Sequence, residues 1–361
     1  MLEKEIRATL ALYQDPYLKK DLLQAGAISR LTVNQDQIII DIILGYPFQR
    51  IEQTIKTNLG RLLAPFAASK KIVIHLSSRI EVHTGKSGLK ALPEVKNIIA
   101  VASGKGGVGK STVAVNLALA LKKEGATVGL LDADIYGPSQ PTMLGVLEEK
   151  PVILDKQLHP ILRHGIQSMS IGYLIDQNTP MVWRGPMIGK ALQQLLHDTK
   201  WDKLDYLIVD LPPGTGDIQL TLCQKIPVSG VVMVTTPQDL ALLDVARACE
   251  MFNKLNVPLL GVIENMSTYH CSKCGHAAPI FGEGGGEKLA QQYGISMLGA
   301  IPLDLRIRET TDSGVPPVMK ENGNEYAEVF YEIAKKVAAE ISLQPKDYSA
   351  RFPKVVVETK I

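Results

Sequence analysis

The sequence predicts an α/β protein in which a parallel sheet is wrapped by helices and is preceded by a small α+β domain. From about residue 96, short apolar runs recur with helical stretches between several of them, which is typical of parallel strands buried on both faces. These runs occupy residues 97–102, 128–131, 206–209, 230–235, 259–263 and 297–301. Before residue 80 the pattern differs, because three strands rich in β-branched residues accompany two helices.

These patterns divide the chain into four segments. The small domain covers residues 1–80, with helices at 3–13 and 47–63 and strands at 28–33, 37–44 and 71–76. Residues 81–95 mix Gly, Ser, Pro and Lys without apolar periodicity and are expected to be a linker. The large domain covers residues 96–345 and ends in a helix near 324–341, and residues 346–361 form a tail.

The composition excludes several classes of protein. The 361 residues include 39 Lys and Arg against 37 Asp and Glu, a net charge of +2, so we expect no nucleic-acid partner and no basic membrane patch. There is no apolar run long enough to span a membrane, and the N-terminus is charged rather than a signal peptide. We therefore expect a soluble, cytoplasmic protein with no membrane partner. The four cysteines are too few for a disulfide scaffold of this size.

A phosphate-binding loop (P-loop) lies between the first strand of the large domain and the helix predicted at 111–123. It consists of Gly104, Lys105, Gly106, Gly107, Val108, Gly109, Lys110, Ser111 and Thr112. The spacing is the Walker A pattern, in which glycines turn backbone N–H groups around a phosphate and Lys110 reaches the β- and γ-phosphates. The Ser111 hydroxyl is placed for Mg²⁺, and the phosphates meet a helix N-terminus.

Lys105 is the unusual residue of this loop. An ordinary P-loop needs no cation at that position. A second lysine therefore suggests that the nucleotide is contacted from a second direction, across a dimer interface.

Three carboxylates follow predicted strands of the same sheet. Asp132 and Asp134 come after the strand at 128–131, and an extended backbone places both on one side. They suit Mg²⁺ held through water and positioning of the water that attacks the γ-phosphate. Asp210 ends the strand at 206–209 as a Walker B carboxylate beside Mg²⁺, and the glycine-rich turn at 212–216 can respond to the γ-phosphate.

The base-binding residue favours ATP over GTP. The nearest match to the guanine motif Asn-Lys-x-Asp is the string at 253–256, which lacks the final carboxylate and precedes its strand. Asn265 follows the strand at 259–263 instead, and an amide there can pair with the adenine edge.

Cys271 and Cys274 form a Cys-x-x-Cys loop closed by Gly275. Thiolates at this spacing bind one metal centre from a single turn, and they favour zinc or iron–sulfur clusters. One pair supplies two ligands, whereas a closed site needs four. Two chains that each contribute this pair to one shared cluster are the economical solution. A zinc site and a redox dithiol remain alternatives.

The nucleotide motifs and the thiol pair together resemble a known family. The P-loop with its extra lysine is similar to the deviant Walker A of the SIMIBI class, which includes MinD, ParA, ArsA and the nitrogenase iron protein. Further motifs lie at 132–139, 182–187, 211–217 and 263–267. With Cys271 and Cys274, they identify residues 96–340 as resembling the Mrp/ApbC iron–sulfur cluster carrier ATPases.

The resemblance implies a homodimer that binds ATP and holds a labile [4Fe–4S] cluster between paired Cys-x-x-Cys motifs. Such a carrier receives the cluster from a scaffold or donor protein and passes it to apo iron–sulfur proteins. It implies that Lys105 contacts the partner subunit's nucleotide, that Lys110 and Ser111 hold phosphates and Mg²⁺, and that Asp134 orients the attacking water. We expect slow hydrolysis, because no arginine finger is evident.

The first 80 residues resemble the small domain, DUF59 or MIP18-like, that precedes the ATPase in many bacterial members of the family. That domain often carries a cysteine, whereas this chain has none before Cys223. A partner-docking or regulatory role is therefore expected in place of a metal role.

A MinD- or ParA-like positioning ATPase with a structural zinc site is the alternative function. MinD-like proteins need a C-terminal amphipathic membrane helix, whereas residues 351–358 contain proline and β-branched residues. ParA-like proteins need a basic surface for DNA, which a net charge of +2 does not suggest. Neither class explains the thiol pair.

Overall fold

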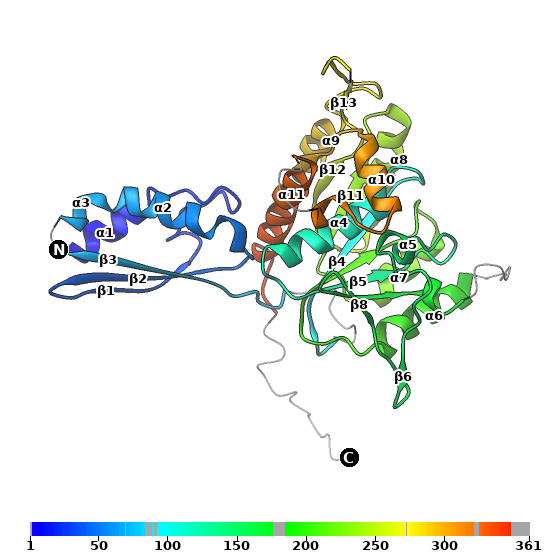
Figure 1. The fold of residues 1–361 in the computed structure, drawn as a ribbon, viewed down its shortest axis with the longest axis horizontal. Helices are drawn as coiled ribbons and strands as arrows, with labels where there is room; N and C mark the ends of the chain where they lie inside the picture. Colours follow the sequence, from blue (N-terminus) through cyan, green and yellow to red (C-terminus); the bar gives the residue numbers. More distant parts are fainter. Residues whose placement is uncertain are drawn as a thin grey trace, which may run out of the picture.

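The computed structural model describes residues 2–68, 70–83, 89, 92–175, 185–271, 273–320 and 325–347. Figure 1 shows two parts, a small sheet with helices on one face and a larger sheet wrapped by helices. The structure agrees with the predicted fold class, a P-loop parallel sheet preceded by an α+β part. The domain limits drawn from the sequence remain predictions. In the part of the chain that the structure describes, no helix combines the length and apolar character needed to cross a membrane.

The first part, residues 2–80, is called the N-terminal unit below. Its strands are β1 (Ile28–Val33), β2 (Gln37–Leu44) and β3 (Lys71–Ser78), with β2 in the centre, antiparallel to β1 and parallel to β3. Strict alternation along β2 buries Ile38, Ile40, Ile42 and Leu44. The helices of this unit are α1 (Leu2–Leu10), η1 (Gln49–Ile51), α2 (Glu52–Leu62) and α3 (Ala64–Ala67). β1 and β2 have the predicted bounds, and α1 ends three residues early.

The second part contains an eight-stranded sheet in the order β15-β12-β11-β4-β10-β5-β9-β8. All neighbouring strands are parallel except β8, which is antiparallel to β9. The six predicted strands are β4 (Val95–Ser103), β5 (Val128–Asp132), β10 (Leu204–Asp210), β11 (Gly230–Thr235), β12 (Leu259–Glu264) and β15 (Ser296–Ala300). The sequence pattern missed β8 (Ile161–Arg163) and β9 (Ile166–Ser170).

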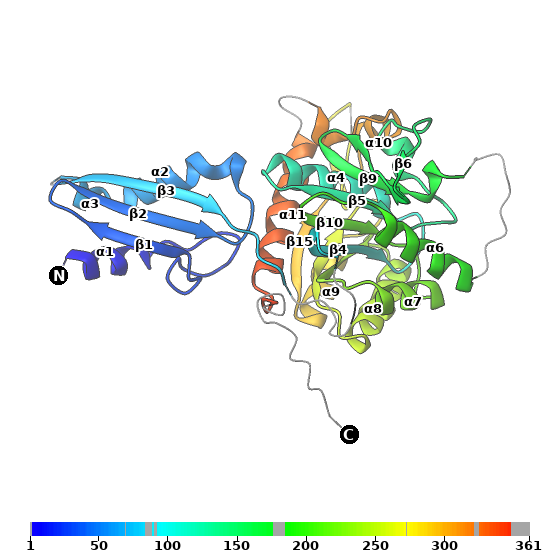
Figure 2. The ribbon, with the colours of Figure 1, turned by 90° about the horizontal axis from the view of Figure 1, so that it is seen from below.

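Helices cover both faces of this sheet (Figure 2). They are α4 (Lys110–Lys123), α5 (Gln140–Met143), α6 (Gly185–Asp198), α7 (Asp217–Lys225), α8 (Asp239–Lys254), α9 (Gly285–Tyr293), α10 (Leu305–Asp312) and α11 (Glu325–Ser342), with short η2 (Ile171–Tyr173) and η3 (Pro317–Met319). The strands between them are buried nearly throughout. Because the strands are parallel, the loops after β4, β5, β10 and β12 meet at one edge, where ligands of such sheets bind.

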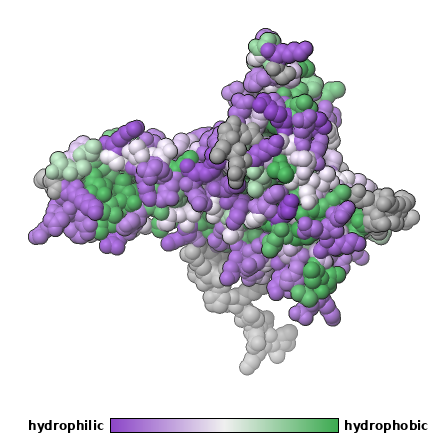
Figure 3. Space-filling model, in the orientation of Figure 1, coloured by the Kyte–Doolittle hydropathy of each residue, from purple (hydrophilic) through white to green (hydrophobic). Residues whose placement is uncertain are grey.

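Two short hairpins project from the second part. One pairs β6 (Ile153–Leu154) with β7 (Gln157–Leu158), and the other pairs β13 (Tyr269–His270) with β14 (Ala277–Ala278). The β6–β7 hairpin exposes apolar side chains, since Ile153 is 66% exposed. Figure 3 shows this apolar patch at the lower right of the molecule.

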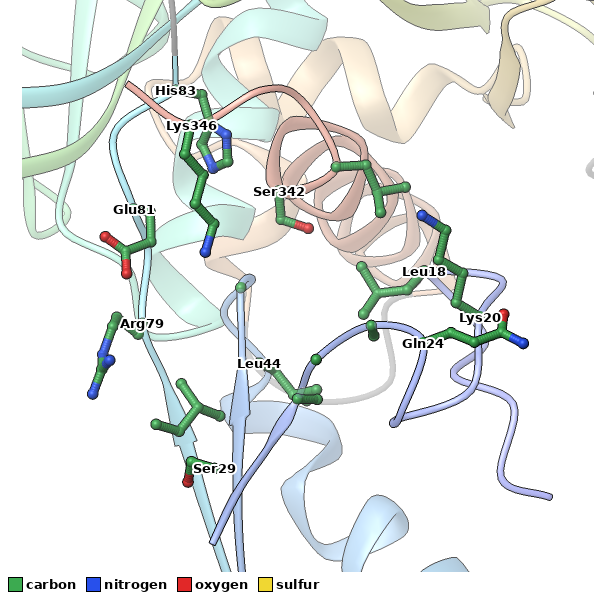
Figure 4. Close-up of a pocket in the computed structure, with 16 residues that line it drawn as sticks. Leu18, Lys20, Gln24, Ser29, Leu44, Arg79, Glu81, His83, Ser342 and Lys346 are labelled. Carbon is green, nitrogen blue, oxygen red and sulfur yellow. The ribbon is translucent and has the colours of Figure 1, made fainter. Parts of the chain in front are cut away.

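The N-terminal unit contacts the second part through α11 and the end of α4. The Arg50 guanidinium lies 3.5 Å from the centre of the Tyr331 ring and 2.6 Å from a Glu328 carboxylate oxygen. The backbone N–H of Arg50 donates to the carboxylate of Glu124, which is buried directly after α4. A cavity of about 390 Å³ lies at the same junction, between the ends of the small sheet and of α11 (Figure 4). The junction therefore reaches the far end of the helix whose N-terminus forms the P-loop.

Replacing Arg50 by alanine is expected to lower the free energy of unfolding by about 1–3 kcal/mol, because a cation–π contact and a partly buried ion pair are lost together. Urea unfolding of the full chain measures the change. Lys56→Ala is the matched control, since the ion pair of Lys56 among the described residues is with Glu52 one turn away on the surface of α2. This substitution should lower the free energy of unfolding by about 0.5 kcal/mol or less. Equal effects of the two substitutions would contradict the importance of the Arg50 contacts.

Candidate functional site

The P-loop connects β4 to α4 at the carboxyl edge of the large sheet. Gly107 and Gly109 have φ angles of +81° and +80°, and Gly109 precedes the first turn of α4. A Cβ atom on Gly109 would overlap the side-chain amide of Asn265, and one on Gly104 would overlap the backbone of Asp244. Glycine is therefore required at these positions for conformation and for space.

A cavity of about 300 Å³ opens on this loop. It is lined by most of the P-loop, including Lys105, Lys110 and Ser111, and by Asp134 and Pro213. Predicted phosphate-binding residues and one predicted carboxylate thus lie around one space. Pro213 belongs to the glycine-rich turn after β10, so that turn also faces the cavity.

Lys110 is buried and makes an ion pair inside the site. Its Nζ lies 2.5 Å from Oδ1 of Asp210, at the end of β10, and 3.9 Å from Oδ2 of Asp134. Asp210 is fully buried, and a buried carboxylate without a counter-charge is costly. The lysine therefore neutralises the Walker B carboxylate in this structure. Burial raises the pKa of Asp134, and the nearby Lys110 ammonium opposes this shift.

Asp132 lies beside the cavity but makes different contacts from Asp134. Its carboxylate accepts bonds from the backbone N–H groups of Asp134, Ser139 and Gln140 and from the Ser170 hydroxyl, each at 3.1 Å. Complete burial, together with the charge of Asp210, raises the pKa of Asp132 to about 7. Asp132 thus holds the loop that carries Asp134, while Asp134 itself lines the cavity. Direct contact of Asp132 with the nucleotide or with Mg²⁺ remains a prediction.

Gln140 is a site residue that the sequence did not reveal. Its Nε2 donates to Oδ2 of Asp210 at 2.8 Å and to the carbonyl of Ser111 at 3.1 Å. The side chain is buried at the start of α5 and ties the P-loop helix to the end of β10. No motif announces this role, because its partners lie 29 and 70 residues away in the sequence.

Asn265 follows β12 and anchors the P-loop from the side. Its Nδ2 donates to the carbonyl of Val108 at 2.8 Å, and the residue is 8% exposed. This bond uses one N–H of the amide. A contact of the remaining amide groups with an adenine base stays a prediction.

The Cys-x-x-Cys loop forms the tip of the β13–β14 hairpin, at the top of Figure 1 and away from the N-terminal unit. The Cys271 N–H donates to the backbone carbonyl of His276 at 2.9 Å, and the Gly275 N–H donates to the backbone carbonyl of Cys271 at 2.8 Å. Cys271 is partly exposed and Cys274 is exposed. Bonds from the backbone N–H groups of Cys274 and Lys273 lower the pKa of the Cys271 thiol, which favours the thiolate that binds metals.

One copy of this loop provides too few ligands for a closed metal site. Among the residues placed in the structure, no three or more His, Cys, Asp and Glu side chains group together as metal ligands. Cys223 and Cys249 are buried in α7 and α8, apart from the hairpin. The sequence motif at 182–187 gives no further information, because residues 182–184 lie outside the described residues.

Comparison with known proteins finds a matching family model for each of the two parts of the chain. Residues 94–338 match the family model described as NUBPL iron-transfer P-loop NTPase, and residues 3–67 match the model described as iron-sulfur cluster assembly protein. The iron-sulfur cluster carrier protein of Escherichia coli strain K12 is 46% identical over 344 residues, which cover 95% of this chain and 93% of that protein. The iron-sulfur cluster transfer protein NUBPL of Mus musculus is 48% identical over 259 residues, covering 71% and 81%.

Solved structures agree with the fold. A nucleotide-binding protein from Archaeoglobus fulgidus in complex with ADP has a TM-score of 0.57 and 39% identity, covering 66% of this chain and 93% of that chain. The cell division ATPase MinD of Pyrococcus furiosus has a TM-score of 0.50 and 22% identity, covering 67% and 98%. The second likeness shows the fold alone.

Proposed function

This chain belongs to the family of iron-transfer P-loop NTPases that includes the iron-sulfur cluster carrier proteins, and on that premise we propose that it binds ATP and carries an iron–sulfur cluster to apo-proteins. The observation that carries the proposal is the placement of two accessible thiols, Cys271 and Cys274, on a hairpin that continues from β12. The residue directly after β12, Asn265, contacts the P-loop. The thiols and the nucleotide cavity are therefore joined by one short segment.

The cluster is the cargo, and we propose that two chains hold it. Each copy offers a pair of thiolates, whereas a [4Fe–4S] cluster takes four. The exposed hairpin tip can meet its counterpart without unfolding either chain. A homodimer with one shared cluster satisfies the ligand count. A cluster held from the surface by two loops is also accessible to an apo-protein acceptor.

The nucleotide is a substrate for slow hydrolysis in this proposal. Lys110 holds the β- and γ-phosphates, which compete with Asp210 for its ammonium group, and Asp134 orients the attacking water. Lys105 lines the cavity and makes no ion pair with the described residues, so it is available for the nucleotide of the partner subunit. Turnover controls loading or release of the cluster.

The side chains at the site fit a magnesium ion. Ser111, Asp134 and Asp210 offer only oxygen atoms, which Mg²⁺ prefers, and the buried Ser139 hydroxyl beside the cavity has no partner among the described residues. We propose that Ser111 and Asp210 hold the ion, directly or through water. When bound, it would neutralise charge on the phosphates.

The N-terminal unit is proposed to dock partners or to regulate the ATPase. It contains no cysteine. Its contacts reach the end of α4, and within the described part of the chain none of its residues lines the nucleotide cavity. We place the whole carrier in the cytoplasm. Transfer of a reconstituted cluster from this chain to an apo iron–sulfur enzyme, measured as recovered activity of that enzyme, tests the proposed function. A zinc site or a redox dithiol would give no such recovery.

Replacing Gln140 by leucine is expected to weaken Mg²⁺-dependent nucleotide binding about 10-fold. Mutation of a group that orients a metal-binding carboxylate typically lowers metal affinity about 10- to 100-fold. The substitution removes the bonds to Asp210 and to the Ser111 carbonyl. Titration with a fluorescent ATP analogue, with Mg²⁺ and with EDTA, measures the affinity. Gln167→Leu on β9, which loses the bonds of that side chain to the Asp202 backbone, is the control and should bind as the wild type does. Equal affinity of both variants would contradict the role of Gln140.

A further inference from the structure

We propose that Met266 and Ser267 are positioning residues that transmit occupancy of the nucleotide cavity to the thiols of Cys271 and Cys274. This inference rests on the proposed function and concerns how the two sites of the carrier are coupled. It follows from the segment 265–270, which connects the end of β12 to the thiol hairpin.

The segment begins with an anchor on the P-loop. The Asn265 N–H donates to the carbonyl of Thr235 at 2.7 Å, which keeps this residue on the sheet. Its side chain donates to the carbonyl of Val108 at 2.8 Å, in the middle of the phosphate-binding loop. A change in the P-loop when phosphates bind therefore acts directly on the first residue of the segment.

Met266, the next residue, has a left-handed backbone with φ of +55°. This conformation is uncommon for residues other than glycine, and it persists only where the surroundings hold it. The Met266 Cε lies 3.9 Å from the position that a Cβ on Gly109 would take, so the side chain packs beside the P-loop. The side chain of the strained residue thus lies beside the loop that is proposed to receive the nucleotide.

The rest of the segment is bonded along its length to the chain after β15. The N–H and the hydroxyl of Ser267 both donate to the carbonyl of Ile301 at 3.0 Å. The Leu303 N–H donates to the backbone carbonyl of Thr268 at 3.0 Å. Leu303 also forms a parallel β-bridge with Tyr269, the first residue of β13. The backbone between Met266 and the thiols is therefore constrained by hydrogen bonds at Ser267, Thr268 and Tyr269. A rotation at Met266 must move the hairpin or break these bonds.

The reactivity of the thiols tests this coupling in the cluster-free full-length chain. A chromogenic disulfide reagent reports on Cys271 and Cys274, because Cys223 and Cys249 are 1% and 0% exposed. A saturating non-hydrolysable ATP analogue with Mg²⁺ should restrict motion of the segment 265–270. The reaction of the thiols with the reagent should then slow about 5-fold or more, the lower end of the usual range for coupled sites. An unchanged rate in the wild-type chain would overturn the proposal.

Met266→Gly is the decisive variant. Glycine adopts positive φ without strain and lacks the side chain that packs beside Gly109, so the protection by nucleotide should fall below about 2-fold. Asn256→Gly is the matched control, because Asn256 has φ of +54° but lies exposed before β12, at the opposite end of that strand. It should keep the full protection. Loss of protection in both variants would indicate general loosening and would overturn the proposal.

Met266→Asn separates the backbone from the side chain. Asparagine tolerates the left-handed conformation, so this variant should retain at least half of the protection. Protection that persists in Met266→Gly would show that it arises elsewhere, for example from association of two chains, and would also refute the proposal. Because the assay contains no iron, its outcome is independent of whether the chain carries a cluster.

Discussion

The Cys271→Ala and Cys274→Ala variants are expected to lose cluster binding completely. Each substitution removes half of the thiolates that one chain contributes, and two chains then offer two ligands where a [4Fe–4S] cluster takes four. Anaerobic reconstitution of the wild type should yield about four iron and four sulfide per dimer. The measurements are iron and sulfide content and the visible absorption of the cluster.

The fold should survive these substitutions, because both side chains lie at the surface of a two-stranded hairpin. Basal ATP hydrolysis is therefore a fair companion measurement and should persist. Cys249→Ala is the control for the loss of a thiol. Cys249 is buried in α8, where burial raises the pKa of its thiol to about 12. This variant should bind a full cluster, whereas a cluster that survives the loss of both Cys271 and Cys274 would refute the proposed site.

Lys110→Ala has the second large effect, on nucleotide turnover and on stability. Loss of the phosphate-binding ammonium should lower kcat/KM for ATP by about 100- to 1,000-fold, as removal of one charge-stabilising donor typically does. The same change leaves the buried carboxylate of Asp210 without its counter-charge. Breaking one partner of a buried pair costs about 3–5 kcal/mol, and we expect the free energy of unfolding in the absence of nucleotide to fall by that amount.

The double variant Lys110→Ala/Asp210→Asn separates these two effects. It removes the unpaired charge and should recover most of the lost stability, while ATP turnover stays low. Lys105→Ala is the matched control, since Lys105 lines the same cavity and makes no ion pair with the described residues. It should keep the stability of the wild type. A Lys110→Ala variant as stable as the wild type would contradict the structural role of the Lys110–Asp210 pair.

Much of the fold could be predicted because the signals are local. β1, β2, β11 and the helix after the P-loop follow from runs of a few residues whose apolar periodicity matches the secondary structure. β8 and β9 were missed because they are short and mix polar with apolar residues, as in Ile166–Ser170. Their assignment depends on tertiary pairing, since β9 pairs with β5 and β8 pairs with β9, and a local sequence pattern contains no information about which strands become neighbours.

The candidate site likewise contains residues that local sequence predicts and residues that only the tertiary structure reveals. Lys110, Ser111 and the thiol pair belong to contiguous motifs whose spacing carries their chemistry. Gln140 lacks such a motif, and its place beside Asp210 depends on how the loop after β5 crosses to β10. Asp132 and Asp134 look equivalent in an extended segment. The chain turns after Asp132, however, so one carboxylate is enclosed by backbone N–H groups and the other lines the cavity.

The sequence by itself determined that this chain has a P-loop, a strand ending in Asp210 and a Cys-x-x-Cys thiol pair on a parallel α/β sheet. Only the tertiary structure decided that Lys110 pairs with Asp210, that Gln140 joins them and that Met266 is left-handed beside the P-loop. The physical reason is that periodicity and spacing depend on neighbours in the chain. The surroundings of a buried side chain depend on which strands the sheet places next to each other.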